Sequence, residues 1–285
     1  MSEHGPLPLY RRAGALALVY LATALPAALA AAPFARAAAR LVGHDPRGDA
    51  LLWRPGGAWL VEAGRGALEI VPAALPLAPW LLAPWALALV VPWGLLLAAL
   101  VTEGPLGRGA GRVLLGRLGP LVSLTALSVI TRAAALAAGA AFALEFGPSL
   151  AGASASARTR DLLTLAFALL APVGYGLVRL VHDLALAACV RRREAAAASL
   201  VTALGTVYRG FGRALAPFLA SLLVQGASVA LAAWAVGRLM GTPDEWPWVL
   251  ALHQATLLVV VVARALWLRR ALALVGPPWP PPDED

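Results

Sequence analysis

The sequence has no lysine, a single cysteine and few charged residues of either sign. Charged residues make up 13% of the 285 positions, whereas roughly a quarter is usual in water-soluble domains. Hydrophobic residues make up 60% of the chain, and its mean hydropathy is +0.77. This composition excludes an ordinary soluble domain and predicts an integral membrane protein whose helices share one bundle.

The single cysteine, Cys189, excludes an intrachain disulfide and any metal site built from several cysteines. We interpret it as a small apolar residue near a helix end. All 23 basic residues are arginines, a bias typical of GC-rich genomes. The sequence shows no metal-ligand cluster, nucleotide-binding loop or credible catalytic constellation. We therefore expect no metal, no cofactor and no enzymatic activity.

Six long apolar stretches dominate the chain, and a helix needs about 20 such residues to cross roughly 30 Å of hydrocarbon. The sequence therefore predicts an all-α fold, a polytopic bundle of six transmembrane helices within one domain, residues 1–275. The predicted spans are 13–32, 77–101, 119–144, 161–181, 214–236 and 248–267. The remaining residues, 276–285, are rich in proline and acidic side chains, and we expect this tail to be disordered.

Arginines near the ends of the spans predict the orientation. Arg11 and Arg12 precede the first span, whose apolar run is longer than the roughly 7–15 residues of a signal-peptide core, so we expect a retained helix. The loops on the side of the N-terminus hold more arginines than the opposite loops do. This asymmetry predicts a bacterial cytoplasmic (inner) membrane protein with both termini in the cytoplasm.

Two loops predict amphipathic interfacial helices. In loop 33–76, Glu62, Arg65 and Glu69 share one helix face, which favours either a lid over a pathway or a packing element. Between the fourth and fifth spans, Leu200, Leu204, Tyr208, Phe211 and Leu215 fall at helical spacing. We expect that helix to rest on anionic phospholipid headgroups, contacted by basic residues in and before it: Arg191, Arg192, Arg193 and Arg209.

Polar residues inside the predicted spans are the strongest functional indication. Arg132 lies at the midpoint of the third span, where an arginine costs at least roughly 2.5 kcal/mol on insertion scales. Thr125 and Ser128 share its helix face, and Ser221 and Gln225 hold a similar position in the fifth span. In the fourth span the central Pro172 is followed by Gly174, Tyr175 and Gly176, and this segment predicts a kink that frees backbone carbonyls.

Two hypotheses follow from this arrangement. The first is a buried site for an anionic group or lipid headgroup, formed by Arg132, Ser128, Thr125, Gln225, Ser221 and Tyr175. The second is interhelical hydrogen bonding without a ligand. No acidic residue is expected at this depth, which argues against a carboxylate proton relay. We place Arg179, His182 and Asp183 at the cytoplasmic end of the fourth span and interpret them as structural.

Three resemblances to known families bear on function. Trp53-Arg54, Gly152-Ala153-Ser154 and His253 resemble motifs of the six-helix rhomboid intramembrane serine proteases. The chain departs from that family because Arg158, Arg160 and Asp161 separate Ser154 from the following span. We interpret His253 as a hydrogen-bonded residue at a helix contact. Glu194-Ala195-Ala196, Gly205 and Pro217 resemble the coupling loop of ABC-importer permeases, with a different spacing between the acidic residue and the glycine.

The third resemblance is to uncharacterised bacterial six-helix inner-membrane proteins, and it is carried by residues 48–68 and 182–204. This group implies no activity. The functional hypotheses therefore stay open: a transport or lipid-handling protein, a structural membrane component or assembly partner, a permease-like subunit, or a rhomboid-like protease. The expected partners are the lipid bilayer with its anionic headgroups and possible membrane or ATP-binding subunits, but not nucleic acid.

Overall fold

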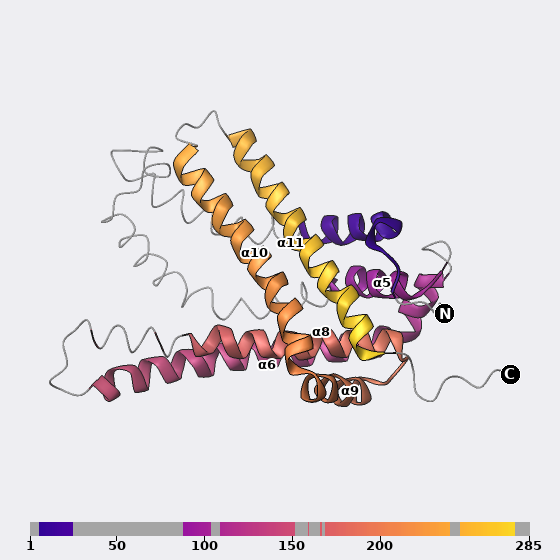
Figure 1. The fold of residues 1–285 in the computed structure, drawn as a ribbon, viewed down its shortest axis with the longest axis horizontal. Helices are drawn as coiled ribbons and strands as arrows, with labels where there is room; N and C mark the ends of the chain where they lie inside the picture. Colours follow the sequence, from indigo (N-terminus) through magenta and orange to yellow (C-terminus); the bar gives the residue numbers. More distant parts are fainter. Residues whose placement is uncertain are drawn as a thin grey trace. The chain divides into compact units, whose positions relative to one another are not determined.

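The structure is a computed structural model that describes residues 6–24, 88–103, 109–151, 159, 166, 169–239 and 246–276. Helix accounts for 92% of what it describes, and these residues contain no strand, which confirms the all-α class. Figure 1 shows the labelled helices: α5 (Val90–Val101), α6 (Gly111–Ala151), α8 (Leu170–Arg191), α9 (Ala196–Arg209), α10 (Phe211–Leu239) and α11 (Trp246–Val275). A 3₁₀ turn, Leu9–Arg12, precedes helical residues 13–24.

Four of the described helices are long and apolar enough to cross a membrane: Gly111–Gly139, Leu170–Arg191, Phe211–Val236 and Pro247–Val275. They correspond to the last four predicted spans. The first two predicted spans are only partly described, as helical residues 13–24 and as the shorter apolar helix α5. The six-span count therefore remains a prediction. The amphipathic helix expected in loop 33–76 and the tail 277–285 lie outside the described residues.

Helix α8 differs from its predicted span in a way that matters for function. It begins at Leu170 and continues to Arg191, whereas the apolar window predicted an end at residue 181. Pro172 consequently lies in the first turn of α8, where its missing N–H would have no intrahelical partner. Residues 160–165 and 167–168 lie outside the described residues, so the kink predicted around Pro172 stays a prediction. His182 and Asp183 lie well inside the helix, so their predicted position at its cytoplasmic end is wrong.

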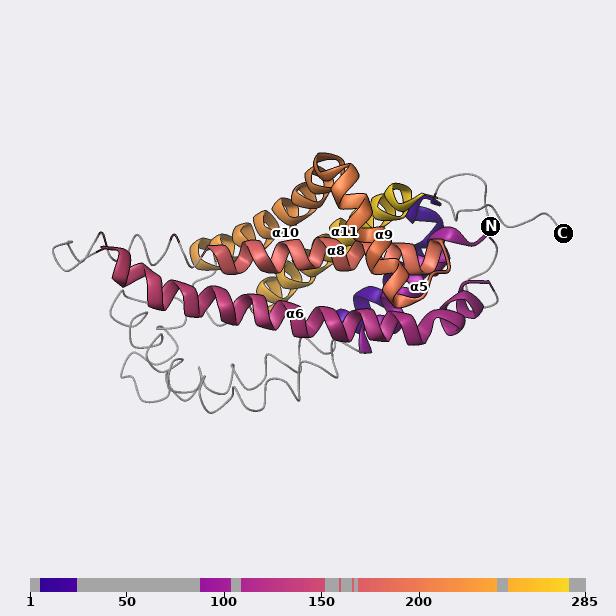
Figure 2. The ribbon, with the colours of Figure 1, turned by 90° about the horizontal axis from the view of Figure 1, so that it is seen from below.

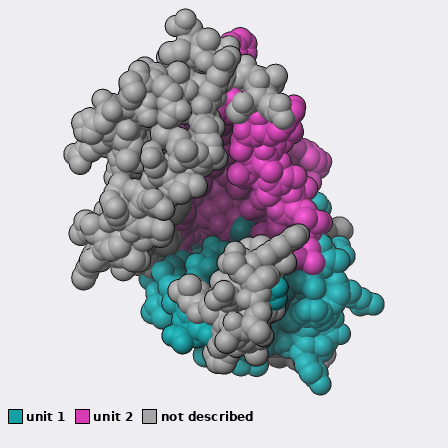
Figure 3. Space-filling view, turned by 90° about the vertical axis from the view of Figure 1, so that its left-hand side faces the viewer, with its two compact units in different colours: residues 1–6, 101–216, 268–285 teal, residues 7–100, 217–267 magenta. Residues whose placement is uncertain are grey.

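The described chain divides into two compact units, coloured separately in Figure 3. The first comprises residues 1–6, 101–216 and 268–285 and contains α6, α8 and α9. Helices α6 and α8 lie side by side (Figure 2), and α9 packs on both. The core of this unit is the second half of α8, where residues 182–190 are all buried. On α9, the small residues Ser199 and Ala203 form the buried face.

A glycine allows α6 and α8 to approach closely. A Cβ built on Gly139 of α6 would lie 2.5 Å from the Ala171 Cβ and 2.6 Å from the Ala171 Cα. Ala135, one helical turn earlier, lies opposite Gly174 of α8. Because the residue numbers rise along one helix as they fall along the other, the pair is antiparallel. Small residues at such a crossing are typical of helix packing in membranes.

The second unit comprises residues 7–100 and 217–267 and contains most of α5, α10 and α11. Neutral hydrogen bonds join its helices: the Ser221 hydroxyl donates to the Ala263 carbonyl over 3.0 Å, and the Tyr20 hydroxyl donates to Gln254 Oε1. The rings of Phe218 and Trp267 pack edge to face with centroids 5.3 Å apart. Helix α5 is almost completely buried.

Large apolar side chains remain exposed along the candidate spans. On α10, Leu223 is 72% exposed and Trp234 57%, and on α11 Trp248 is 69% exposed. Exposed apolar surface of this extent is unusual on a monomeric soluble protein, and in lipid it carries no penalty. The four apolar helices therefore indicate insertion into a membrane.

Candidate functional site

The centre of the site is Arg132, on the face of α6 that packs against α8. Its Nη2 donates to His182 Nδ1 over 3.1 Å. Its guanidinium carbon lies 5.3 Å from the centroid of the Tyr175 ring, a cation–π arrangement. Tyr175 and His182 are seven residues apart, so they lie on one face of α8 two turns from each other. These two side chains of α8 thus help to offset the cost of placing Arg132 inside a predicted span.

The hydrogen bonding of Arg132 assigns the tautomer of His182. Because a guanidinium only donates, Nδ1 must accept, and the proton of the neutral ring is on Nε2. Nε2 lies 3.5 Å from the Thr125 hydroxyl oxygen on α6. Thr125 and Arg132 are also seven residues apart. The same spacing on both antiparallel helices places Thr125 beside His182 and Arg132 beside Tyr175.

An acidic residue stands beside this network. Asp183 is fully buried, and its Oδ1 lies 3.6 Å from His182 Nδ1. The expectation that no acidic residue lies at the depth of Arg132 is therefore wrong. The error has one cause: α8 extends past the apolar window, so its polar residues 182 and 183 pack inside the unit and not at its edge.

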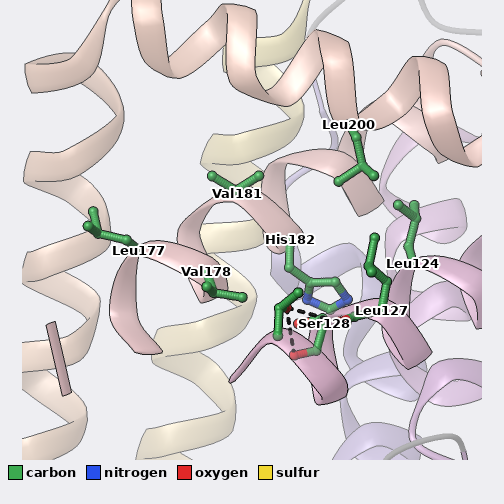
Figure 4. Close-up of a pocket in the computed structure, with 9 residues that line it drawn as sticks. Leu124, Leu127, Ser128, Leu177, Val178, Val181, His182 and Leu200 are labelled. Atoms are coloured by element: carbon green, nitrogen blue, oxygen red, sulfur yellow. Dashed lines mark hydrogen bonds between the residues drawn. The ribbon is translucent and has the colours of Figure 1, made fainter. Parts of the chain in front are cut away.

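An apolar pocket of about 290 Å³ borders the network (Figure 4). It is lined by residues of α6, α8 and α9: Leu124, Leu127, Ser128, Thr131, Leu177, Val178, Val181, His182 and Leu200. Ser128 and His182 lie next to each other, and Leu177 stands farther from them in Figure 4. The Ser128 hydroxyl oxygen is buried and has no hydrogen-bond partner within the described chain. The surface of the pocket is therefore almost entirely apolar, and the adjacent residues Ser128 and His182 mark one end of it, which we call the polar end.

The structure brings together four of the six predicted site residues: Thr125, Ser128, Arg132 and Tyr175 all lie around His182 or the pocket beside it. The other two, Ser221 and Gln225, belong to the second unit. Gln225 Nε2 donates to the Ser221 hydroxyl over 2.9 Å, and that hydroxyl donates to α11. Their described bonds thus serve contacts within α10 and between α10 and α11.

The four arginines predicted to contact headgroups have different surroundings. Arg191 Nη1 donates to the Leu272 carbonyl over 3.1 Å, near the end of α11, where a cation suits the helix dipole. Arg192 pairs with Glu194 over 2.9 Å. Arg193, which has a positive φ of 53°, and Arg209 are exposed. Only the exposed pair stays in a position typical of headgroup contact, and that role remains a prediction.

The interfacial helix predicted over residues 200–215 is divided in the structure. Helix α9 ends at Arg209, Gly210 has the non-helical torsions φ −148° and ψ 49°, and α10 begins at Phe211. Helix α9 turns back along α8, so Leu200 faces the pocket, while Val201, Leu204 and Tyr208 are exposed. The exposed face is apolar, but a resting place on a bilayer surface remains a prediction.

The residues behind the family resemblances give little support to catalysis. Trp53, Arg54 and Ser154 lie outside the described residues. His253 is exposed on α11, and Glu194 bonds to Arg192 and to the Thr202 hydroxyl. In the part of the chain that the structure describes, no group of three acidic, histidine or cysteine residues is placed to hold a metal ion.

Comparisons of the chain with protein family models, with curated proteins and with solved structures found no match.

Proposed function

We propose that this chain is a multi-pass membrane protein that handles lipids by holding an anionic amphiphile in the pocket between α6, α8 and α9. The observation that carries the proposal is an apolar pocket whose lining residue His182 contacts Arg132. Its walls are leucine and valine, while its polar end has the unpartnered Ser128 hydroxyl and His182, which is bonded to the Arg132 guanidinium. A hydrocarbon tail suits the walls, and a negative headgroup suits the polar end.

The size and access of the pocket favour a slim ligand that arrives from the membrane. Its volume of about 290 Å³ is just below the range of roughly 300–1,000 Å³ usual for ligand pockets. Leu127 and Leu177, both of which line it, are each 44% exposed. Since these side chains belong to candidate spans, a lipid tail has an apolar route to the pocket. A single-chain anionic lipid meets both conditions.

A structural role is the second candidate, because the same contacts tie α6 to α8 without any ligand. Arg132 bridges to Tyr175 and His182 across the helix pair, as polar residues commonly do in membrane bundles. The permease-like and protease-like hypotheses gain no support from the described residues. For the cellular context we propose a cytoplasmic membrane with both termini in the cytoplasm, supported by the distribution of arginines.

Hexadecyl sulfonate, which carries a permanent negative charge, tests the proposal. Binding to the full chain in nonionic detergent is measured by native mass spectrometry, with hexadecanol as the uncharged comparison. We expect one sulfonate per chain, weaker binding of hexadecanol, and at least a tenfold loss of sulfonate affinity in Arg132→Gln. Arg112→Gln is the matched control, because Arg112 is exposed on the same helix, about 30 Å away at 1.5 Å per residue.

Two results would contradict the proposal. One is equal binding of sulfonate and hexadecanol, which would show that no anionic headgroup is recognised. The other is equal loss of sulfonate binding in Arg132→Gln and Arg112→Gln, which would place the recognition outside the pocket. If the wild-type chain binds neither probe and Arg132→Gln only lowers stability, the structural role is the better description.

A further inference from the structure

His182 Nδ1 lies within reach of two partners of opposite kind. The Arg132 Nη2 donor is 3.1 Å away, and the Asp183 Oδ1 acceptor is 3.6 Å away. A ring nitrogen of histidine has one position for hydrogen bonding, which either accepts through its lone pair or donates through its proton. Nδ1 can therefore accept a hydrogen bond from Arg132 when it is unprotonated, and it can donate one to Asp183 when it carries a proton.

Protonation of the ring changes the situation of Arg132. In the neutral ring protonated on Nε2, the lone pair of Nδ1 accepts from the guanidinium, whose Nη2 lies 3.1 Å away. Once Nδ1 carries a proton it no longer accepts, and the two positive groups repel each other over a short distance. Asp183 then takes the Nδ1 proton in a charge-assisted hydrogen bond, and Arg132 needs a new negative partner.

The charges of the buried groups also favour binding of an anion together with a proton. Arg132 and Asp183 carry opposite charges, and a neutral His182 ring adds no charge to them. An anion entering alone would change the net charge of this buried group by one unit, and an uncompensated charge is costly in a low-dielectric environment. An anion that enters with one proton leaves the net charge of the site unchanged.

The groups around His182 come from three helices. Helix α6 presents Arg132 and the uncharged Thr125 hydroxyl, and α8 presents Asp183 beside the ring. Tyr175, also on α8, contacts the Arg132 guanidinium. Helix α9 contributes the apolar Leu200 to the pocket wall. Histidine ordinarily changes its charge near pH 6.5, so among these side chains it is the one suited to take up a proton near neutral pH.

We infer that the pocket takes its anionic ligand together with one proton, which is drawn from water and held on His182. This inference rests on the proposed function. In the ligand-bound state, the Nδ1–H donates to Asp183, and Arg132 pairs with the anion at the polar end of the pocket. Neither covalent chemistry nor a further reactant is needed, because the only change is one N–H bond formed with a proton from solvent.

Isothermal titration calorimetry of the full chain with hexadecyl sulfonate tests the inference. The titration is run in phosphate and in Tris at the same pH, because these buffers release very different heats when they ionise. The sulfonate headgroup does not titrate, so a heat that depends on the buffer reports proton uptake by the protein. We expect close to one proton per ligand at pH 7.5 and an affinity that increases by up to about tenfold per unit of falling pH.

His182→Gln is the decisive variant, since its amide oxygen accepts from Arg132 but takes no proton near neutral pH. We expect it to bind the sulfonate with the same heat in both buffers and with an affinity independent of pH between 5.5 and 8. His253→Gln is the matched control, because His253 is exposed on α11, and it should behave as the wild type does.

The outcomes separate this inference from the proposed function. Binding by the wild type with equal heats in the two buffers would overturn proton uptake and leave the amphiphile site standing. Proton uptake that persists in His182→Gln would also overturn the inference, because the proton would then be held elsewhere. Absence of sulfonate binding in the wild type would remove the proposed function itself.

Discussion

The close crossing of α6 and α8 gives a sharp test of the packing that supports the site. In Gly139→Ala the new Cβ would lie 2.5 Å from the Ala171 Cβ, 2.6 Å from its Cα and 2.8 Å from its backbone nitrogen. Cβ atoms essentially never approach other atoms within 3.0 Å. Since no side-chain rotation moves these atoms of Ala171, the two helices must separate. Gly139→Ala therefore strains the interface directly.

The expected magnitude follows from two opposing effects. Alanine is favoured over glycine inside a helix by up to about 1 kcal/mol, whereas overpacking a tight contact costs about 1–3 kcal/mol. Gly139→Ala should therefore destabilise the protein by up to about 2 kcal/mol. Gly174→Ala on the same interface is the matched control, because its Cβ would make an ordinary 3.5 Å contact with the Ala135 Cβ. That control should be neutral or slightly stabilising.

Two measurements check this prediction. The free energy of unfolding is obtained in mixed micelles for both variants and the wild type. Spin labels at the exposed positions Leu136 and Val173 report the separation of the helices, which should increase only in Gly139→Ala. If Gly139→Ala is as stable as Gly174→Ala and the distance between the labels is unchanged, the close approach of α6 and α8 is refuted.

Two further predictions concern the second unit. Ser221→Ala removes a hydrogen bond from α10 to α11 and should lower the free energy of unfolding by about 0.6–1.7 kcal/mol, whereas Ser228→Ala, which loses a bond within its own helix, should cost less. Equal losses of unfolding free energy in the two variants would show that the hydrogen bond between α10 and α11 stabilises the protein no more than the bond within α10 does. Arg264 lies 4.4 Å from the centroid of the Trp93 ring, so a double-mutant cycle of Trp93→Leu and Arg264→Met should give a coupling of about 0.5–2 kcal/mol. A coupling near zero would contradict the cation–π contact.

The helices were predictable from the sequence, but their ends were not. The apolar windows predicted a helix wherever the structure describes one of the four long candidate spans, because a backbone in lipid must satisfy its own hydrogen bonds. The end of α8 could not be predicted in the same way. Residues 182–190 continue the helix because α6 and α9 cover them, and such a contact is invisible to a hydropathy window.

The candidate site was partly predictable for the same reason. The polar face of α6 indicated Thr125 and Arg132, and Tyr175 was expected from the opposite helix. His182 was missed because its depth depends on the antiparallel register of α6 and α8. The seven-residue spacing from Tyr175 to His182, equal to that from Thr125 to Arg132, was the available signal. It acquires meaning only when the two helices are known to face each other.

The choice of polar groups within the protein supports a ligand more than a purely structural role. Helix α10 is held to α11 by the uncharged Ser221 hydroxyl and a backbone carbonyl, which is sufficient to join two helices. At the α6–α8 contact the chain instead places Arg132, His182 and Asp183 together, at a desolvation cost that a neutral contact would avoid. His182, which contacts Arg132, lines an apolar pocket that also has the unpartnered Ser128 hydroxyl, so a negative group bound there would account for this cost.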